Sequence, residues 1–346
     1  TIKLDGNFPT GTDNVALGQN ALANVTTGQK NTAIGDDAMF ANTEGNYNVA
    51  IGEGSIEDNT TGGFNVGIGR QALNSNTTAS NNTGVGYFVL AANTTGANNA
   101  AFGFGALDAS TTASNNTAVG YASLSANTTG AQNTAVGGNT LDANTTANNN
   151  TAVGYNSQTS NTTGFANSSL GQGSLFSNTT GANNTAIGNG ALDNNTTASH
   201  NTAVGANALD ANTTGTQNTA VGSLSLDANT TANNNTAIGY ISLGANTTGA
   251  QNTAVGSATL DANTTGADNT SIGFASLGNN TTASNNTAVG SVALNETTTG
   301  GSNTAVGRSA LEKNTTGSLN TAVGGNALDA NVTSSSNTAI GYNSLT

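Results

Sequence analysis

Apolar residues recur along this sequence at two fixed places in a repeat of 17 residues, and polar residues fill most of the space between them. In the copy around Gly120, Val119 directly precedes the glycine and Leu124 follows it by four positions. The glycine recurs in 20 copies, from Gly18 to Gly341, without an insertion. So short and strict a period predicts a solenoid in which each copy is one coil stacked on its neighbours.

Each copy predicts two short strands and two turns. Residues 116–119, Asn-Thr-Ala-Val, form a first strand that ends at the glycine, and a second strand contains Ser123 and Leu124. A helix is excluded because Asn, Thr and Gly dominate and no 3.6-residue period is present. We therefore predict an all-β fold, a parallel β-solenoid in the form of a flattened β-roll with 20 coils of 17 residues over residues 14–346. Residues 1–13 lie outside the repeat and are either a cap on the first coil or a junction to an upstream domain.

The glycine of each copy is never replaced. Such invariance within one chain requires either a positive φ or a neighbour too close for a Cβ atom. Ten positions later glycine alternates with alanine, as at Gly130 and Ala147, so this second position needs no positive φ. The positions on which we base the structural role of the glycine are Gly120, Gly137 and Gly188.

The asparagine four positions before each glycine is equally constant. Identical amides stacked from coil to coil form hydrogen-bonded ladders in stacked β structures. We therefore assign a structural role, and not ligand binding, to this column. Its representatives are Asn116, Asn133 and Asn184.

The pattern of the first strand predicts cover on both of its faces. The Ala118 position accepts only Ala, Gly or Ser, which predicts a close neighbour, and the Val119 position always holds a larger apolar residue, which predicts burial there as well. Neighbouring residues of a strand point to opposite faces. One face is then the coil interior, and the other is predicted to pack on further copies of the chain around a common axis.

Composition argues against several kinds of partner and site. Only 7% of residues are charged, and the net charge is −13 with five basic residues, which argues against a nucleic-acid partner because phosphate binding needs Lys and Arg. The absence of cysteine excludes disulfides and thiolate metal sites. No apolar run approaches the ~18 residues of a membrane span, so no membrane insertion is expected.

Candidate chemistry is sparse, so we expect neither an enzyme nor a cofactor. His200 is the single histidine, at a turn position where other copies carry Asn. Acidic residues recur five positions after the glycine; they either line a Ca²⁺ face, if several meet near an axis, or form a solvated rim. The members of this column are Asp108, Asp142, Asp193, Asp210, Asp227, Asp261 and Asp329. Of these, Asp108, Asp142 and Asp210 are the candidate Ca²⁺ ligands.

Tyrosine follows the glycine directly in several copies. Such a row either forms an aromatic stripe for glycan contact or reflects surface packing, and its irregular spacing favours surface packing. The tyrosines concerned are Tyr87, Tyr121, Tyr155, Tyr240 and Tyr342.

The run Asn-Thr-Ala-Val/Ile-Gly-x-x-Ala/Ser-Leu resembles the head repeats of YadA-type trimeric autotransporter adhesins. Residues 337–345, Asn-Thr-Ala-Ile-Gly-Tyr-Asn-Ser-Leu, are similar to repeats of phage tail-fibre-like and large bacterial surface proteins. The resemblance covers residues 14–346, and the coils here are longer than those of the adhesin heads. It implies a left-handed roll that assembles as a trimer.

Two functional classes follow. The first is a homotrimeric fibre or adhesin segment on a virion or cell surface, hence extracellular, with a surface glycan or protein as a further partner. End-to-end association is also expected, because the last copy, ending at Thr346, lacks the distinct composition of a cap. The second is an ice-binding solenoid with Thr and Asn ladders. Its weakness is that paired threonines such as Thr128 and Thr129 are adjacent and point apart in a strand.

Overall fold

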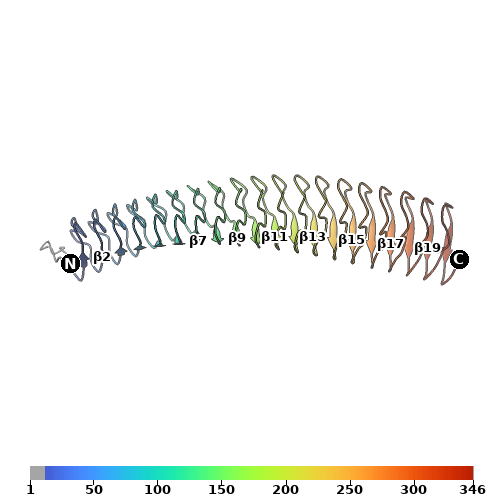
Figure 1. Cartoon of the computed structure of the whole chain (residues 1–346), viewed down its shortest axis with the longest axis horizontal. Coiled ribbons are helices and arrows are strands. Elements are labelled where there is room, and N and C mark those ends of the chain that lie inside the picture. The colour runs from blue at the N-terminus through green and yellow to red at the C-terminus, as the bar shows by residue number, and fades with distance from the viewer. Residues whose placement is uncertain (1–11, 346) are drawn as a thin grey trace. The chain divides into compact units, whose positions relative to one another are not determined.

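The structure is a computed structural model and describes residues 12–345. The chain divides into two compact units, Thr1–Gln172 and Gly173–Thr346. Each unit is a stack of similar coils with one short strand per coil (Figure 1). The expected cap or junction at residues 1–13 falls almost wholly on residues outside the described part. Thr12 already belongs to the stack, since its carbonyl accepts a hydrogen bond from the Lys30 N–H at 3.1 Å.

Ten three-residue strands lie in each unit. Those of the first unit are β1 (Val15–Leu17), β2 (Thr32–Ile34), β3 (Val49–Ile51), β4 (Val66–Ile68), β5 (Thr83–Val85), β6 (Ala100–Phe102), β7 (Thr117–Val119), β8 (Thr134–Val136), β9 (Thr151–Val153) and β10 (Ser168–Leu170). Those of the second are β11 (Thr185–Ile187), β12 (Thr202–Val204), β13 (Thr219–Val221), β14 (Thr236–Ile238), β15 (Thr253–Val255), β16 (Thr270–Ile272), β17 (Thr287–Val289), β18 (Thr304–Val306), β19 (Thr321–Val323) and β20 (Thr338–Ile340).

Strand pairing follows the sequence period. Within each unit every strand pairs in parallel with the strand of the next coil, and each residue lies beside the residue 17 positions later, as in Thr117↔Thr134 and Val119↔Val136. Like side chains therefore stack on like side chains. The predicted parallel β-solenoid with one coil per 17 residues is confirmed.

The predicted second strand is absent from the coils, which is a correction to the two-sheet form. Residues 121–126 are a turn, with a φ of 49° at Ala122 and 52° at Leu124. Two left-handed residues, separated by one position, curl the backbone out of the extended form. The turn still satisfies its backbone, because the Ala122 N–H donates to Phe104 O at 2.9 Å and the Leu124 N–H donates to Thr140 O at 3.0 Å.

The interior of each coil consists of one small and one large apolar residue. Ala118 comes from the strand and Leu124 from the turn, and both are fully buried. A Cβ atom on Gly67, in the alanine column, would lie 2.7 Å from Ile56 Cγ1, which explains why only small residues occur there. Such columns form one apolar core cluster within residues 21–152 and another within residues 175–339.

Val119 does not belong to this interior, so of the two strand faces predicted to need cover, the Val119 face is the one that the chain itself leaves open. The Val119 side chain is 37% exposed, because alternate residues of the strand face opposite sides and only the alanine side meets the coil's own turn.

The coil around Gln158 shows how a polar residue is accommodated in the core. Gln158 takes the place of the buried leucine, and Ser169 takes the place of an alanine in the next strand. The Gln158 amide donates to Ser169 Oγ at 2.8 Å and to Thr151 O at 3.1 Å. Ser169 therefore helps to satisfy the Gln158 amide nitrogen, whereas the buried Gln158 Oε1 has no hydrogen-bond partner.

Two asparagine ladders run through each stack. In the predicted column, Asn116 Oδ1 accepts the Asn133 backbone N–H at 2.9 Å and Asn116 Nδ2 donates to Gly130 O at 2.9 Å, so these bonds join side chain to backbone and not amide to amide. In the second, Asn127 donates to the same Gly130 O at 3.0 Å, and its side-chain oxygen accepts the Asn144 amide at 2.9 Å. Asn184 has the bonding of Asn116 in the second unit, with Ala198 O at 2.9 Å and the Asn201 N–H at 3.0 Å.

Both reasons for an invariant glycine hold at once. Gly120 has a φ of 139°, and a Cβ there would lie 2.3 Å from Gly137 O in the next coil. Gly188 has the same φ, and its Cβ would lie 2.4 Å from Gly205 O. Gly130, in the column that also holds alanine, does not have a left-handed φ, as predicted.

Candidate functional surfaces

The most extensive candidate surface is the outer face of the sheet. We call it the strand face; it consists of the first and third residues of each strand. The third residues, from Leu17 to Leu170 in the first unit and from Ile187 to Ile340 in the second, are all Val, Ile, Leu or Phe. They are half-buried to exposed, with 37% of Val119 and 41% of Phe102 in contact with solvent. Parallel sheets are almost always covered on both faces, so an exposed apolar row on this face makes it a candidate interaction surface.

Threonine accompanies the apolar row on the strand face. It is the first residue in five of the ten strands of the first unit and in all ten strands of the second. Thr202 and Val204 of β12 are both half-buried on this side, whereas Ala203 between them is fully buried. The strand face thus repeats one Thr-and-Val/Ile pair per coil in the second unit.

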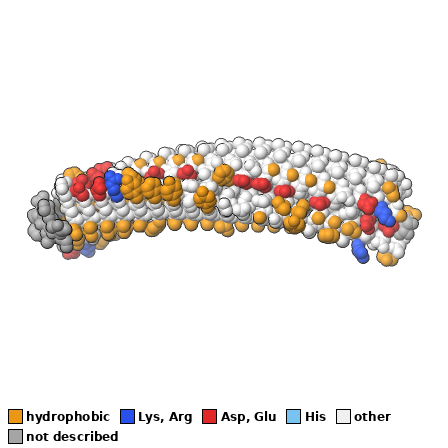
Figure 2. Space-filling model, in the orientation of Figure 1, with side chains coloured by type: hydrophobic (Ala, Val, Ile, Leu, Met, Phe, Trp, Pro, Cys, Tyr) orange, Lys and Arg blue, Asp and Glu red, His pale blue; other side chains and the backbone are white. Residues whose placement is uncertain are grey.

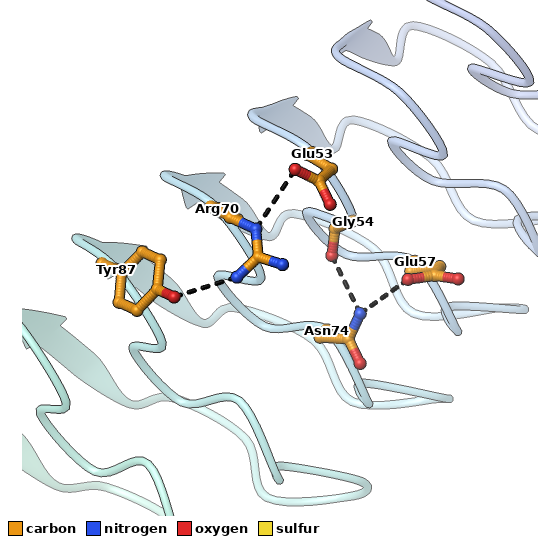
Figure 3. Close-up of polar contacts among 6 residues, drawn as sticks. All are labelled: Glu53, Gly54, Glu57, Arg70, Asn74 and Tyr87. Carbon is orange, nitrogen blue, oxygen red and sulfur yellow. Dashed lines mark hydrogen bonds and ion pairs between the residues drawn. The ribbon is translucent and has the colours of Figure 1, made fainter.

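A second candidate surface is a row of side chains that directly follow the invariant glycine in the first unit. It begins with Glu53 and Arg70, whose carboxylate oxygen and Nε lie 3.1 Å apart (Figure 3). The Arg70 Nη1 donates to the Tyr87 hydroxyl at 2.9 Å, and its guanidinium carbon lies 5.7 Å from the ring centre. The hydrogen bond with Glu53 raises the pKa of Arg70 further above its usual range.

Aromatic rings continue this row. Tyr87, Phe104 and Tyr121 stack in three successive coils, with ring centres 5.4 and 5.5 Å apart and planes inclined by 14°. Phe104 was missed because only tyrosines were considered; a census of all aromatic residues after the glycine would have found it. We call Arg70, Tyr87, Phe104 and Tyr121 the aromatic row. Figure 2 shows hydrophobic side chains gathered beside basic ones in this part of the first unit.

The other predicted tyrosines do not extend this stack. Tyr155 covers the backbone of Gly138, since its ring lies 3.5 Å from where a Cβ of that glycine would be. Tyr342 covers Gly325 in the same way at 3.4 Å. Tyr240 follows Ser223 and precedes Ser257 in its column. These three residues behave as surface packing, whereas Tyr87 and Tyr121 belong to a continuous stack.

The acidic column forms a row of half-buried carboxylates. Asp193, Asp210 and Asp227 occupy three successive coils of the second unit, and acidic side chains are visible along the coils in Figure 2. Burial raises the pKa of all three, and the Asp210 charge raises the pKa of Asp193 and Asp227 further. Burial likewise raises the pKa of Asp108 and Asp261.

The candidate Ca²⁺ ligands are not brought together. Asp108 and Asp142 are two coils apart, with Ser125 between them donating a hydrogen bond to the Asp142 carboxylate, and Asp210 belongs to the other unit. Within residues 12–345 no group of three or more His, Cys, Asp or Glu side chains is placed to hold a metal ion. His200 is exposed on a turn, and its backbone N–H donates to Ala182 O at 3.1 Å.

The paired threonines have separate roles. The Thr128 hydroxyl donates to Thr145 O of the next coil at 3.1 Å, so it is consumed within the stack. Thr129 is exposed to solvent. The two side chains therefore do not form one flat threonine face, as the sequence argument against that arrangement predicted.

A scan against models of known protein families and a search of curated proteins found no match to this chain. In the described part of the chain, no helix has the length and apolar character that crossing a membrane requires. The functional argument therefore rests on the strand face and the aromatic row.

Proposed function

We propose that this chain is a segment of a homo-oligomeric extracellular fibre, a shaft or adhesive element on a virion or cell surface, and not an enzyme. The observation that carries the proposal is the strand face, a continuous apolar row on the uncovered side of a parallel sheet. Other copies of the chain are the simplest cover, because their own strand faces repeat with the same spacing. Three copies around a common axis is the arrangement that the resemblance to adhesin heads implies.

The size of the strand face is compatible with this role. Ten strands spaced by ~4.8 Å, each three residues long, give a face of roughly 43 by 10 Å per unit, or about 430 Å². Two such units per chain approach the ~800 Å² per partner of a stable interface. The net charge of −13 keeps assembled copies soluble and discourages non-specific lateral association.

The aromatic row supports an adhesive role at one place on the first unit. Tyr and Arg are the residues most enriched where proteins bind partners, and this row presents both on the surface. Its rings stack on each other, so they offer edges and hydroxyl groups outward and offer few free faces. A protein or glycan that contacts ring edges and hydroxyl groups is the partner we infer for an adhesive surface.

Sedimentation analysis of the purified chain tests the proposal. We expect a discrete oligomer, with three copies as the expected number. The variant Val221→Glu places a charge on the strand face of the second unit, at the end of β13, and is expected to shift the population to monomer. Gln251→Glu makes the same change of charge at an exposed turn position and serves as the control. A wild-type chain that sediments as a monomer at all concentrations would contradict the fibre proposal.

Ice binding is the second candidate, and the strand face also supports it. In the second unit one threonine and one Val or Ile repeat per coil on this face without exception, which gives a regular array of hydroxyl and methyl groups. Thermal hysteresis distinguishes the two functions. A monomer that lowers the freezing point, and loses this activity in Thr219→Lys, would favour ice binding over the fibre.

A further inference from the structure

A stack of near-identical coils raises the question of how two copies align along their length. In the second unit all ten strands begin with Thr and end with Val or Ile. A shift of one copy by one coil, about 4.8 Å, replaces every contact on this strand face by an almost identical one. The strand face of the second unit therefore carries little information about axial register.

The strand face of the first unit is different. Its first positions include Val15, Val49, Val66 and Ala100 in place of threonine. Strand β6 has the sequence Ala-Ala-Phe where the common strand is Thr-Ala-Val, and β10 differs in another way, with Ser-Ser-Leu. Among all twenty strands Phe102 is the single aromatic third residue, and it is 41% exposed. Ala100 stands on the same face, so a projecting ring lies beside a position with a small side chain.

The coil of β6 also carries the centre of the aromatic row. Phe104 follows Phe102 by two residues, is 51% exposed, and stacks between Tyr87 and Tyr121. Phe102 and Phe104 thus flank the invariant Gly103, one on the strand face and one at its border. Large aromatic residues at the centre of an interface commonly dominate its energetics.

We propose that β6, with Phe102 projecting beside Ala100, is the element that fixes the axial register between copies of this chain. The proposal rests on the fibre function, because it takes a second copy as the occupant of the strand face. When the β6 strands of two copies stand at the same level, the Phe102 ring of one copy meets the space left by Ala100 of the other. A shift by one coil sets Phe102 against β5 or β7, which begin with Thr83 and Thr117, so the space is lost and overpacking is unfavourable. Among the strands of residues 12–345 only β6 combines a projecting ring with a small first residue, so the register that pairs β6 with β6 is favoured.

The test uses the absence of cysteine in the chain. Thr197 and Thr299 are exposed at the same coil position in the second unit, and they are six coils apart (299 − 197 = 102, or 6 × 17). Copies of Thr197→Cys labelled with a nitroxide are refolded together with copies of Thr299→Cys labelled with a gadolinium chelate. Pulsed dipolar spectroscopy then reads only the distance between unlike labels on different copies. Because the labels are separated mainly along the axis, each coil of slippage changes this distance by nearly 5 Å.

The decisive variant is the double change Ala100→Thr and Phe102→Val, which turns β6 into the Thr-Ala-Val strand of β7 and so preserves the coil. We expect a single narrow distance for the wild type. For the variant we expect an oligomer of unchanged size with several distances about one coil apart. Val119→Ile in β7, which keeps Phe102, is the control and should retain the single distance.

The outcomes separate the two proposals. A variant that remains oligomeric with the wild-type distance alone would overturn the register role of β6 and leave the fibre function intact. A variant that becomes monomeric would also overturn it, because β6 would then supply association itself and not alignment. A wild-type chain that does not associate would instead contradict the fibre function on which the proposal rests.

Discussion

Leucine with a positive φ is uncommon in proteins, yet nearly every coil places one in its core. Leu124 has a φ of 52° and no exposed surface. The left-handed conformation costs roughly 1–2 kcal/mol, and burial of the side chain stabilises by about 1.5–3 kcal/mol, so the residue is tolerated. The sequence could not reveal this conformation, because the pattern of leucines reports burial and says nothing about φ. Gly120 was predictable, since only glycine combines a positive φ with a missing Cβ.

Two glycines of the first unit separate the effect of a left-handed φ from the effect of a close neighbour in the next coil. Gly52→Ala places a Cβ at a φ of 132° and 2.5 Å from Gly69 O, so it should lower the free energy of unfolding by at least about 2 kcal/mol. Gly45→Ala is the matched change at a position without a left-handed φ; its Cβ would also lie 2.4 Å from Gly62 O, but the same column accommodates Ala79 between two glycines. It should cost less than about 1 kcal/mol. Chemical denaturation measures both; equal losses would contradict the role of the invariant column.

At the scale of the element, the ladders show what a repeat predicts and what it leaves open. The Asn116 ladder was predictable because its residue never varies. The second strand at Ser123 and Leu124 was not correctly predictable, since apolar spacing alone does not distinguish a strand from a turn whose N–H groups bond to neighbouring coils. The aromatic row was only half predictable, because its regularity depends on Phe104 and Tyr sharing one column.

The Asn127 ladder has an interruption that can be repaired. Ser110 stands where the neighbouring coils have Asn93 and Asn127, and both the Ser110 hydroxyl and the Asn93 side-chain oxygen lack a hydrogen-bond partner. Ser110→Asn should supply an amide to Asn93 and an acceptor to Asn127, which should stabilise the protein by about 1 kcal/mol. Ser114→Asn is the control, at a half-buried position where Asn148 occurs in another coil. No gain in melting temperature for Ser110→Asn relative to this control would show that the break is harmless.

The row of aspartates gives the stack a defined response to pH. Burial raises the pKa of Asp210 above its ordinary value of 3.8, so the folded state binds a proton more tightly than the unfolded state. The charged carboxylate destabilises the folded state, and this destabilisation is complete at pH values above the raised pKa. As pH falls from neutral through the raised pKa towards 3.8, the group becomes protonated and the stability of the fold increases. Asp210→Asn should remove this dependence on pH. At pH 7 it should increase the free energy of unfolding by well under about 1 kcal/mol, because the group is only half-buried, and so raise the melting temperature slightly.

Melting temperatures are measured at several pH values between about 3 and 7, a range that includes the titration of carboxyl groups. Asp268→Asn, at an exposed turn position, is the control. Were Asp210→Asn to lower stability at neutral pH, the aspartate row would have to be stabilising, and the burial argument would fail.

At the scale of the whole molecule, the sequence predicted that the first strand needs cover on both faces, but it could not say which cover the chain provides itself. The coil's own turn covers the Ala118 side, and nothing within the described chain covers the Val119 side. The sequence pattern shows that both faces of the strand carry apolar residues. It cannot distinguish burial within one chain from burial between chains, so the sequence alone did not show whether Ala118 or Val119 faces the interior.

If copies of the chain supply the missing cover, melting must depend on protein concentration. For three chains that fold and associate together, a tenfold increase in concentration stabilises each chain by about 0.9 kcal/mol, two thirds of the ~1.4 kcal/mol that corresponds to a factor of ten. With an unfolding entropy of ~2.1 cal/mol/K per residue, this raises the melting temperature by on the order of 1 °C per tenfold change. Scanning calorimetry over a hundredfold range can resolve the shift. Val221→Glu should melt at a lower temperature that no longer varies with concentration, whereas Gln251→Glu should behave like the wild type. A concentration-independent wild-type transition would mean that each chain is stable with its strand face open to water, and the apolar row would then need a different occupant.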